Sequence, residues 1–281
     1  MTDLANTPRK PCLALMGEFS AGKSTLANLL IGADPLPVQV IATQLPPVWI
    51  TYGDSAPFRT DLEGNQFPIN LNDLGSAPLD QTAYIKIFCE EDILLQCDFI
   101  DMPGISDPNM SSEVWQRMIS RADGVLWCSH ATQAWRQSEA AVWASLPPEL
   151  YNHSLLLLTR SDKITSARDL EKVVRRVKSE TAGLFIDCLP ISLLQATGNQ
   201  DDYDAWAQSG AEELARQLVD LLQKLAPEPV MGAFADDDVP PARPVISAFA
   251  APERRPMAEP EVAPMAKIVP RRVKVTSSRR G

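Results

Sequence analysis

The sequence predicts an α/β domain in which a mainly parallel sheet is flanked by helices, followed by a disordered tail. Short apolar runs typical of buried strands alternate with segments of helical periodicity as far as residue 226. A glycine-containing turn joins the first of these runs to the first helical segment. Beyond residue 226 the apolar periodicity ends, and residues 227–281 contain 10 of the 24 prolines. Such a segment cannot bury enough apolar surface to offset the entropy lost when it is ordered.

We therefore expect an N-terminal extension (residues 1–10), one folded domain (residues 11–226) and the tail (residues 227–281). Strands are expected where apolar or alternating runs lie between turn-forming residues. In chain order these runs are residues 12–16, 48–52, 58–62 and 67–71 (a hairpin), 84–88, 93–101, 125–129 and 155–159, with a further strand just before Pro190. Helices are expected at residues 24–31, 167–181 and 211–225, the last being the one helix between the sheet and the tail. Ser166 and Asp169 form the expected cap of the second helix.

Composition and charge limit the function classes. With 45% hydrophobic residues, the 281-residue chain can build a sizeable core. It has 26 Lys and Arg against 36 Asp and Glu, a net charge of −10, and this balance disfavours a general nucleic-acid binder. No apolar run reaches the length of a membrane span, and the polar N-terminus lacks the apolar core of an export signal. Five widely spaced cysteines fit reduced thiols, so we expect a cytoplasmic protein.

The tail differs in charge from the domain. It carries nine basic and seven acidic residues, and beyond Glu261 it has six basic residues and no acid. Two interpretations stay open. The basic end can dock on an anionic membrane surface or an acidic partner, or it can be a solubilising tail without a fixed partner. The second interpretation is favoured, because disordered chain ends often carry blocks of charge.

Residues 17–24 form the motif with the most chemical content. Gly17-Glu18-Phe19-Ser20-Ala21-Gly22-Lys23-Ser24 fits GxxxxGK[ST], the phosphate-binding loop of P-loop NTPases, and Thr25 continues it. The glycines let the backbone turn tightly and aim successive N–H groups at an anion. Lys23 would reach the β- and γ-phosphates, the Ser24 hydroxyl would bind Mg²⁺, and the following helix would point its N-terminus at the charge.

Two later segments bear on metal and base recognition. Asp101-Met102-Pro103-Gly104 ends a strand, where an aspartate can hold a magnesium-bound water and the Gly104 amide can sense a γ-phosphate. Thr159-Arg160-Ser161-Asp162 follows an apolar strand, and a carboxylate there can accept two hydrogen bonds that guanine donates and adenine does not. Taken alone, the first segment is a weak signal that also fits an ordinary strand-ending turn, but its place 78 residues after Lys23 strengthens it. The second segment, taken alone, fits a solvated aspartate at a strand end equally well. Ser192 is a further candidate for lining the base, and Thr43 lies where a switch threonine would close on Mg²⁺.

With these residues in place, the chain resembles the dynamin family of GTPases, particularly bacterial dynamin-like proteins. The resemblance covers most of residues 11–226 and rests on residues 17–25, Thr43 ahead of Pro46, Tyr52-Gly53, residues 93–104, Ala122-Asp123 and residues 159–162. It implies a GTP-binding domain in which Lys23 and Ser24 serve phosphate and Mg²⁺, and Thr43 belongs to the first switch.

The resemblance also implies that Asp101 and Gly104 belong to the second switch and that Asp162 recognises guanine. Ser20 matches the loop serine that dynamins use near the γ-phosphate and an associated monovalent cation, such as K⁺. Arg160 replaces the family's usual lysine beside the guanine plane, where an arginine can also stack.

Other departures from the family pattern concern catalysis. Phe19 stands where animal dynamins carry a glutamine that helps catalysis. Ile105 follows Gly104, where Ras-like proteins have their water-positioning glutamine. We therefore expect intrinsic turnover on the order of 10⁻⁴ to 10⁻² s⁻¹ until a partner or self-association completes the site. Arg136 has two open interpretations, a charge-stabilising finger or, more commonly for surface arginines, a solvated loop residue.

The leading hypothesis is a Mg²⁺-dependent GTPase that converts GTP to GDP and phosphate, as a nucleotide-dependent switch or an assembly GTPase. It would pair as a G-domain homodimer or with a second dynamin-like protein. The alternative is a nucleotide-binding scaffold with negligible hydrolysis that tethers a partner through its tail, and a third candidate is an ATPase. With a single helix after the sheet, the chain is not expected to remodel membranes alone.

Overall fold

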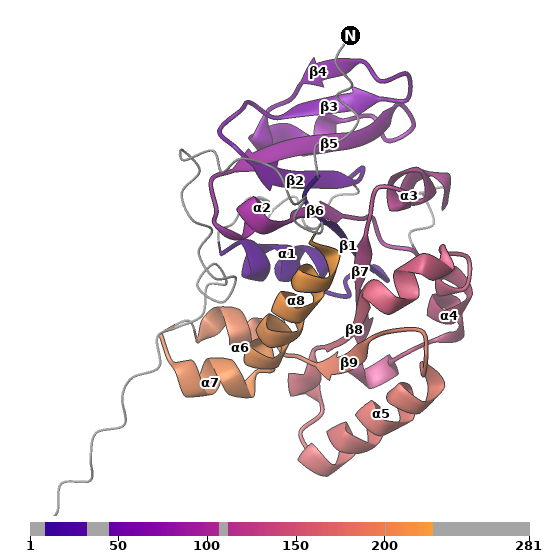
Figure 1. Cartoon of the computed structure of the whole chain (residues 1–281), viewed down its shortest axis with the longest axis vertical. Helices are drawn as coiled ribbons and strands as arrows, with labels where there is room; N and C mark the ends of the chain where they lie inside the picture. Colours follow the sequence, from indigo (N-terminus) through magenta and orange to yellow (C-terminus); the bar gives the residue numbers. More distant parts are fainter. Residues whose placement is uncertain (1–8, 33–44, 107–111, 200, 227–281) are drawn as a thin grey trace, which may run out of the picture.

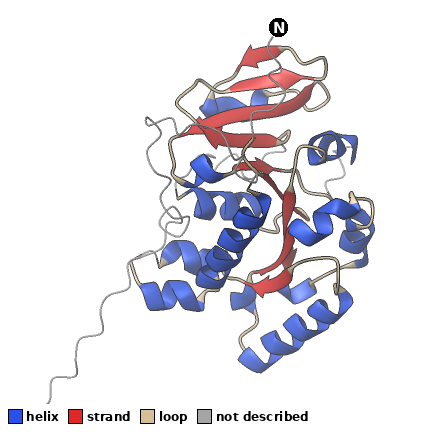
Figure 2. Ribbon diagram, in the orientation of Figure 1, coloured by secondary structure: helices blue, strands red, loops and turns tan. Residues whose placement is uncertain are grey.

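The computed structural model describes residues 9–32, 45–106, 112–199 and 201–226, which form a nine-stranded sheet with helices on both faces (Figures 1 and 2). The strands are β1 (Cys12–Gly17), β2 (Val48–Tyr52), β3 (Phe58–Asp61), β4 (Gln66–Pro68), β5 (Thr82–Cys89), β6 (Asp98–Asp101), β7 (Gly124–His130), β8 (Ser154–Thr159) and β9 (Asp187–Pro190).

The α-helices are α1 (Lys23–Ile31), α2 (Ile93–Gln96), α3 (Ser112–Ile119), α4 (Gln137–Trp143), α5 (Ala167–Glu180), α6 (Leu193–Gly198), α7 (Tyr203–Gln208) and α8 (Ala211–Leu225). Short 3₁₀ turns lie in the connections, at η3 (Leu71–Ser76), η4 (Ala131–Gln133), η5 (Pro148–His153) and η6 (Ser161–Lys163).

The strand order in the sheet is β4-β3-β5-β2-β6-β1-β7-β8-β9. The last five strands of this order, from β6 to β9, are all parallel to one another, and β2 is also parallel to β5. Strand β2 runs antiparallel to β6, and β3 runs antiparallel to both β4 and β5. The prediction of a mainly parallel α/β sheet is therefore confirmed.

Successive residues of β1 enter two separate hydrophobic cores. Leu13 and Leu15 join the core that includes apolar side chains of α1, α2, α6 and α8, whereas Ala14 and Met16 join the core that includes those of α3, α4 and α5. Figure 1 shows these two groups of helices on opposite sides of the central strands. Because side chains alternate along a strand, a continuous apolar run suits a strand that is covered on both faces.

Most of the elements predicted from sequence are confirmed, and most of their ends lie within two residues of the predicted ones. The predicted cap of α5 is present, since the Ser166 side chain accepts a hydrogen bond from the Asp169 N–H. Residues 1–10, apart from Arg9 and Lys10, and the predicted tail (residues 227–281) lie outside the described residues.

Two predictions were wrong. Residues 93–97 do not extend β6: residues 93–96 form helix α2, and the Cys97 N–H donates to the carbonyl of Ile93. The turn buries Ile93 and Leu94 and exposes Leu95, so a short apolar run fitted a helical turn as well as a strand. Moreover, three helices rather than one follow β9 within the described residues. The sequence did not predict α6 and α7, because they are too short to show helical periodicity.

The described part of the chain contains no helix that is long and apolar enough to cross a bilayer. All five cysteines are free thiols and four of them are buried, as the sequence predicted.

We expect Gly210→Ala to lower the free energy of unfolding by about 2–4 kcal/mol, through left-handed strain and a backbone clash. Gly210 precedes α8 with a φ of 93°, and a Cβ there would lie 2.3 Å from the Pro190 carbonyl oxygen. Gly64 is the matched control, because its φ is 91° but a Cβ would meet nothing within 4 Å. Gly64→Ala should cost only about 1–2 kcal/mol. Urea unfolding of both variants measures the difference, and equal losses would contradict the importance of the Pro190 contact.

Candidate functional site

The carboxyl ends of the parallel strands bring the candidate residues to one edge of the sheet. Gly17 ends β1, Asp101 ends β6 and Thr159 ends β8, while Ser192 follows β9. Loops that follow parallel strands meet at this edge, which is where open α/β sheets bind ligands. Residues 17–25, 101–104 and 159–162 thus lie near one another. Thr43 lies outside the described residues, so its predicted role stays a prediction.

The phosphate-loop backbone needs glycine at both ends. Gly17 has a φ of 141°, and a Cβ there would lie 2.1 Å from the carbonyl oxygen of Cys128 on the neighbouring strand β7. Gly22 has a φ of 95° and immediately precedes α1. Ser20, between them, is also in the left-handed region, at 57°. This series of turns carries the chain from a buried strand to the start of a helix within five residues.

Lys23 is folded back over the loop. Its Nζ donates to the carbonyl oxygens of Gly17 at 3.3 Å and Glu18 at 2.9 Å, and only 8% of the residue is exposed. Burial lowers the pKa of Lys23, and the nearby Asp101 carboxylate acts in the opposite direction. The ammonium group is therefore confined to the interior of the loop, where an anion would meet it.

Ser24 and Asp101 are in direct contact. The Ser24 hydroxyl donates to Asp101 Oδ2 at 2.7 Å. The other carboxylate oxygen, Oδ1, is buried and has no hydrogen-bond partner among the described residues. A buried carboxylate oxygen without a partner, next to a hydroxyl, is a donor set that suits a hard divalent cation. The two predicted metal-binding residues that the structure describes thus fit Mg²⁺.

The segment after β6 lies across the phosphate loop. A Cβ on Gly104 would lie 2.9 Å from both N and Cα of Phe19, so position 104 has room only for glycine while the loop keeps this position. The Ile105 N–H donates to the Gly17 carbonyl at 3.1 Å, and the Phe19 N–H donates to Ser106 Oγ at 3.2 Å. A movement of residues 104–106 would therefore be felt directly by the phosphate loop.

Thr159 and Arg160 also contact this loop. Thr159 Oγ1 donates to the carbonyl of Ala21 at 2.8 Å, and Arg160 donates through Nη2 to the carbonyl of Ser20 at 2.9 Å. Arg160 itself has a left-handed backbone, with a φ of 55°. These contacts join the segment predicted to recognise the base to the segment predicted to bind phosphate.

Asp162 and Ser192 lie together, as the sequence prediction required. The Ser192 hydroxyl donates to Asp162 Oδ1 at 2.8 Å, and Lys163 Nζ lies 3.6 Å from Asp162 Oδ2. The Ser192 hydroxyl also accepts a hydrogen bond from the Gln195 N–H at the start of α6. Ser192 therefore orients the carboxylate that was predicted to read guanine.

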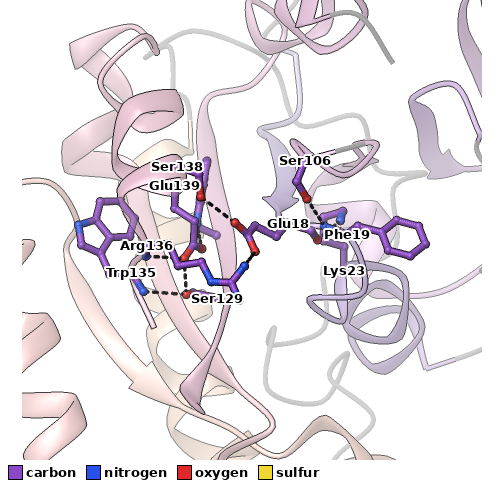
Figure 3. Close-up of polar contacts among 10 residues, drawn as sticks. Glu18, Phe19, Lys23, Ser106, Ser129, Trp135, Arg136, Ser138 and Glu139 are labelled. Atoms are coloured by element: carbon purple, nitrogen blue, oxygen red, sulfur yellow. Dashed lines mark hydrogen bonds and ion pairs between the residues drawn. The ribbon is translucent and has the colours of Figure 1, made fainter. Parts of the chain in front are cut away.

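Arg136 lies at the phosphate loop and is paired with a buried carboxylate. Its Nη1 lies 2.9 Å from Glu18 Oε2, and the Ser138 hydroxyl donates to Glu18 Oε1 at 2.8 Å (Figure 3). The Arg136 side chain is 46% exposed. Arg136 is therefore not a freely solvated arginine, and its role as a charge-stabilising finger stays a prediction.

A second carboxylate, Glu139, holds the corner between β7 and α4. It accepts hydrogen bonds from Trp127 Nε1 at 3.0 Å, from Ser129 Oγ at 2.9 Å and from the Arg136 N–H at 2.9 Å. Burial raises the pKa of Glu139, and these hydrogen bonds oppose that rise. Sequence reasoning missed Glu139, although an acid three residues into a helix is a known signal of N-terminal capping. It also missed the two partners of Glu18, which no sequence pattern indicates.

Comparison with known proteins shows which family the sequence resembles. Residues 13–146 match the model of the dynamin family. A curated relative, Dynamin-like protein 2 of Campylobacter jejuni subsp. jejuni serotype O:23/36 (strain 81-176), is 28% identical over 195 residues. The match covers 67% of this chain and 32% of the relative, so this chain spans about a third of that protein's length.

Two solved structures support the fold. Both come from an oligomerised bacterial dynamin pair described as a mechanism for long-range sensing and tethering of membranes. They resemble this chain with TM-scores of 0.55 and 0.58 at 19% identity, over 77% of this chain and 34% and 40% of their own chains. The predicted resemblance to bacterial dynamin-like proteins and the predicted P-loop fold are thereby confirmed.

Asp101→Asn should stabilise the nucleotide-free protein and weaken metal-dependent binding. Burial raises the pKa of Asp101, although Lys23 and Ser24 oppose the rise. When the pKa of a carboxyl is higher in the folded state than in the unfolded chain, the folded state loses stability as the pH rises and the carboxyl ionises. Charged Asp101 therefore costs stability at neutral pH. We expect the substitution to raise Tm by roughly 2–4 °C, which corresponds to about 1 kcal/mol in a domain of this size.

The same substitution should weaken Mg²⁺-dependent nucleotide binding by about tenfold or more, because a charged metal ligand is lost. Thermal unfolding without nucleotide and titration with GTP and Mg²⁺ measure the two effects. The matched control is Asp220→Asn, which changes a half-exposed aspartate of α8. A lower Tm for Asp101→Asn would contradict the assigned cost of the buried charge.

Proposed function

Because residues 13–146 match the model of the dynamin family, we propose that this chain binds GTP together with Mg²⁺ and hydrolyses it to GDP and phosphate. The observation that carries the proposal is the contact between Ser24 and Asp101 beside the buried Lys23, at the turn from β1 into α1. A buried ammonium and a buried carboxylate oxygen without a partner suit a ligand that brings both anionic oxygens and a divalent cation.

The phosphates would be held mainly by the backbone. N–H groups of the loop and of the first turn of α1 would face the anion. Lys23 would exchange the two carbonyl oxygens that it now contacts for phosphate oxygens. Ser24 and Asp101 would hold Mg²⁺, which when bound neutralises charge on the phosphates, and Thr43 would join them from the first switch.

Guanine recognition is proposed for Asp162. Its carboxylate, oriented by Ser192, would accept hydrogen bonds from the guanine N1–H and exocyclic amine, while Arg160 would cover the base plane. Adenine lacks this pair of donors and would leave the acid unpaired, which disfavours an ATPase.

Hydrolysis by the isolated chain is proposed to be slow. Phe19 is 52% exposed and apolar, and Ile105 is apolar too, so neither side chain can orient an attacking water. Ser20 is the proposed contact of a monovalent cation such as K⁺. We further propose that pairing with a second copy, or with a second dynamin-like protein, completes the site, because similar structures come from a bacterial dynamin pair.

The test is phosphate release from GTP and Mg²⁺, with and without potassium, at rising protein concentration. We expect release per molecule to increase with concentration and to fall at least about 100-fold in Lys23→Ala, because the lysine contacts the transferring phosphoryl group. The control Lys224→Ala changes a lysine in the last turn of α8. Wild-type release no higher than that of Lys23→Ala would favour the alternative, a nucleotide-binding scaffold with negligible hydrolysis. The apolar Phe19 and Ile105 are the observations that keep this alternative open.

Base choice has its own test. Asp162→Asn should weaken GTP binding by about 10- to 100-fold and improve binding of xanthosine triphosphate, whose base presents a carbonyl where guanine has its amine. Competition among GTP, ATP and xanthosine triphosphate measures the preference. Unchanged selectivity in this variant would remove Asp162 from the proposal, and equal competition by ATP in the wild type would remove the guanine assignment altogether.

A further inference from the structure

The phosphate loop contains a negative charge of its own. Glu18 directly follows Gly17, the last residue of β1, and its side chain is only 11% exposed. The backbone carbonyl of the same residue accepts a hydrogen bond from Lys23 Nζ at 2.9 Å. A polyphosphate bound by this loop would meet a buried anion of like charge, and such a charge is weakly screened by solvent.

Arg136 supplies the opposite charge at this point. Its guanidinium contacts Glu18 Oε2 from the corner between β7 and α4, 118 residues away in the sequence, while Ser138 occupies the other carboxylate oxygen. Figure 3 shows both donors converging on Glu18, whereas the Phe19 ring points away from them. Both oxygens of the Glu18 carboxylate are thus hydrogen-bonded, and the Arg136 guanidinium compensates its negative charge.

We infer that Arg136 is a positioning residue for nucleotide binding, which neutralises Glu18 and so lets the phosphate loop accept a polyphosphate. This inference rests on the proposed function of the site. It assigns Arg136 a role in binding affinity rather than in stabilising charge during hydrolysis.

The surrounding contacts favour a fixed role over a moving one. The Arg136 N–H is held by Glu139, which also accepts hydrogen bonds from Ser129 and Trp127. Were the guanidinium to leave for a ligand, the buried Glu18 carboxylate would keep only the neutral Ser138 hydroxyl as its hydrogen-bond donor among the described residues. An uncompensated buried carboxylate is costly, so the pair should persist when nucleotide binds.

The test measures GTP affinity by calorimetry, with a non-hydrolysable GTP analogue and Mg²⁺, in three variants of the full chain. Arg136→Met should weaken binding about tenfold, because it exposes the phosphates to the uncompensated Glu18 charge. Glu18→Gln should bind at least as tightly as the wild type. The double variant should return to within about threefold of the wild type, since it contains neither charge. Arg216→Met, which removes an exposed arginine of α8, is the matched control for loss of positive charge.

The double variant separates charge from shape. It lacks the same contact between Arg136 and Glu18 that Arg136→Met lacks, so a recovery of affinity can come only from removal of the Glu18 charge.

Three outcomes would overturn the inference. One is Arg136→Met binding as tightly as the wild type. Another is a double variant as weak as Arg136→Met, which would indicate a purely structural contact. The third is an unchanged affinity with a lower kcat in Arg136→Met and a higher kcat in Glu18→Gln, as expected for a charge-stabilising finger. If the folded wild type takes up no GTP, the proposed function fails first, so the two failures are distinguishable.

Discussion

The close approach of Gly17 to strand β7 is the constraint on which the candidate site depends. No side chain fits at this position, because a Cβ would lie 2.1 Å from the Cys128 carbonyl oxygen. Glycine lets β1 remain paired with β7 through residue 17 while the backbone turns with a φ of 141°. The carbonyl groups of residues 17 and 18 then face Lys23, and the Gly17 carbonyl also receives the Ile105 N–H. One backbone contact thus positions the lysine and the segment after β6.

The two carboxylates of the site, Glu18 and Asp101, are not equally satisfied by hydrogen bonds. Glu18 is hydrogen-bonded on both carboxylate oxygens, whereas Asp101 keeps one buried oxygen without a partner. Burial lowers the pKa of Lys23 and raises the pKa of Asp101, so burial disfavours both charged forms. A ligand that brings anionic oxygens to the lysine and a divalent cation to the aspartate relieves both costs together. The electrostatics therefore favour a metal-bound polyphosphate over either ion alone.

The corner that presents Arg136 is supported by a cluster of aromatic rings. Trp127 and Trp143 meet edge to face with ring centroids 5.5 Å apart, and Phe185 stacks on Trp143 at 4.0 Å. Trp135, which has a left-handed φ of 58°, packs edge-on against Phe185. Aromatic contacts of this kind restrict side chains to few arrangements. These three tryptophans are thus part of the core and its margin, and they keep the loop after β7 in place beside the phosphate loop.

The sequence by itself determined the elements and motifs that depend on neighbouring residues. Apolar runs predicted the parallel strands, helical periodicity predicted α5 and α8, and residues 17–24 predicted the turn between β1 and α1. Only the tertiary structure decided which distant groups meet: Ser24 with Asp101, Asp162 with Ser192, and Glu18 with Arg136. The third of these pairs joins residues 118 positions apart through the order of strands β1 and β7 in the sheet, and no local periodicity encodes that order. The short helices α2, α6 and α7 were not predicted, because tertiary packing rather than a local sequence pattern stabilises helices of this length.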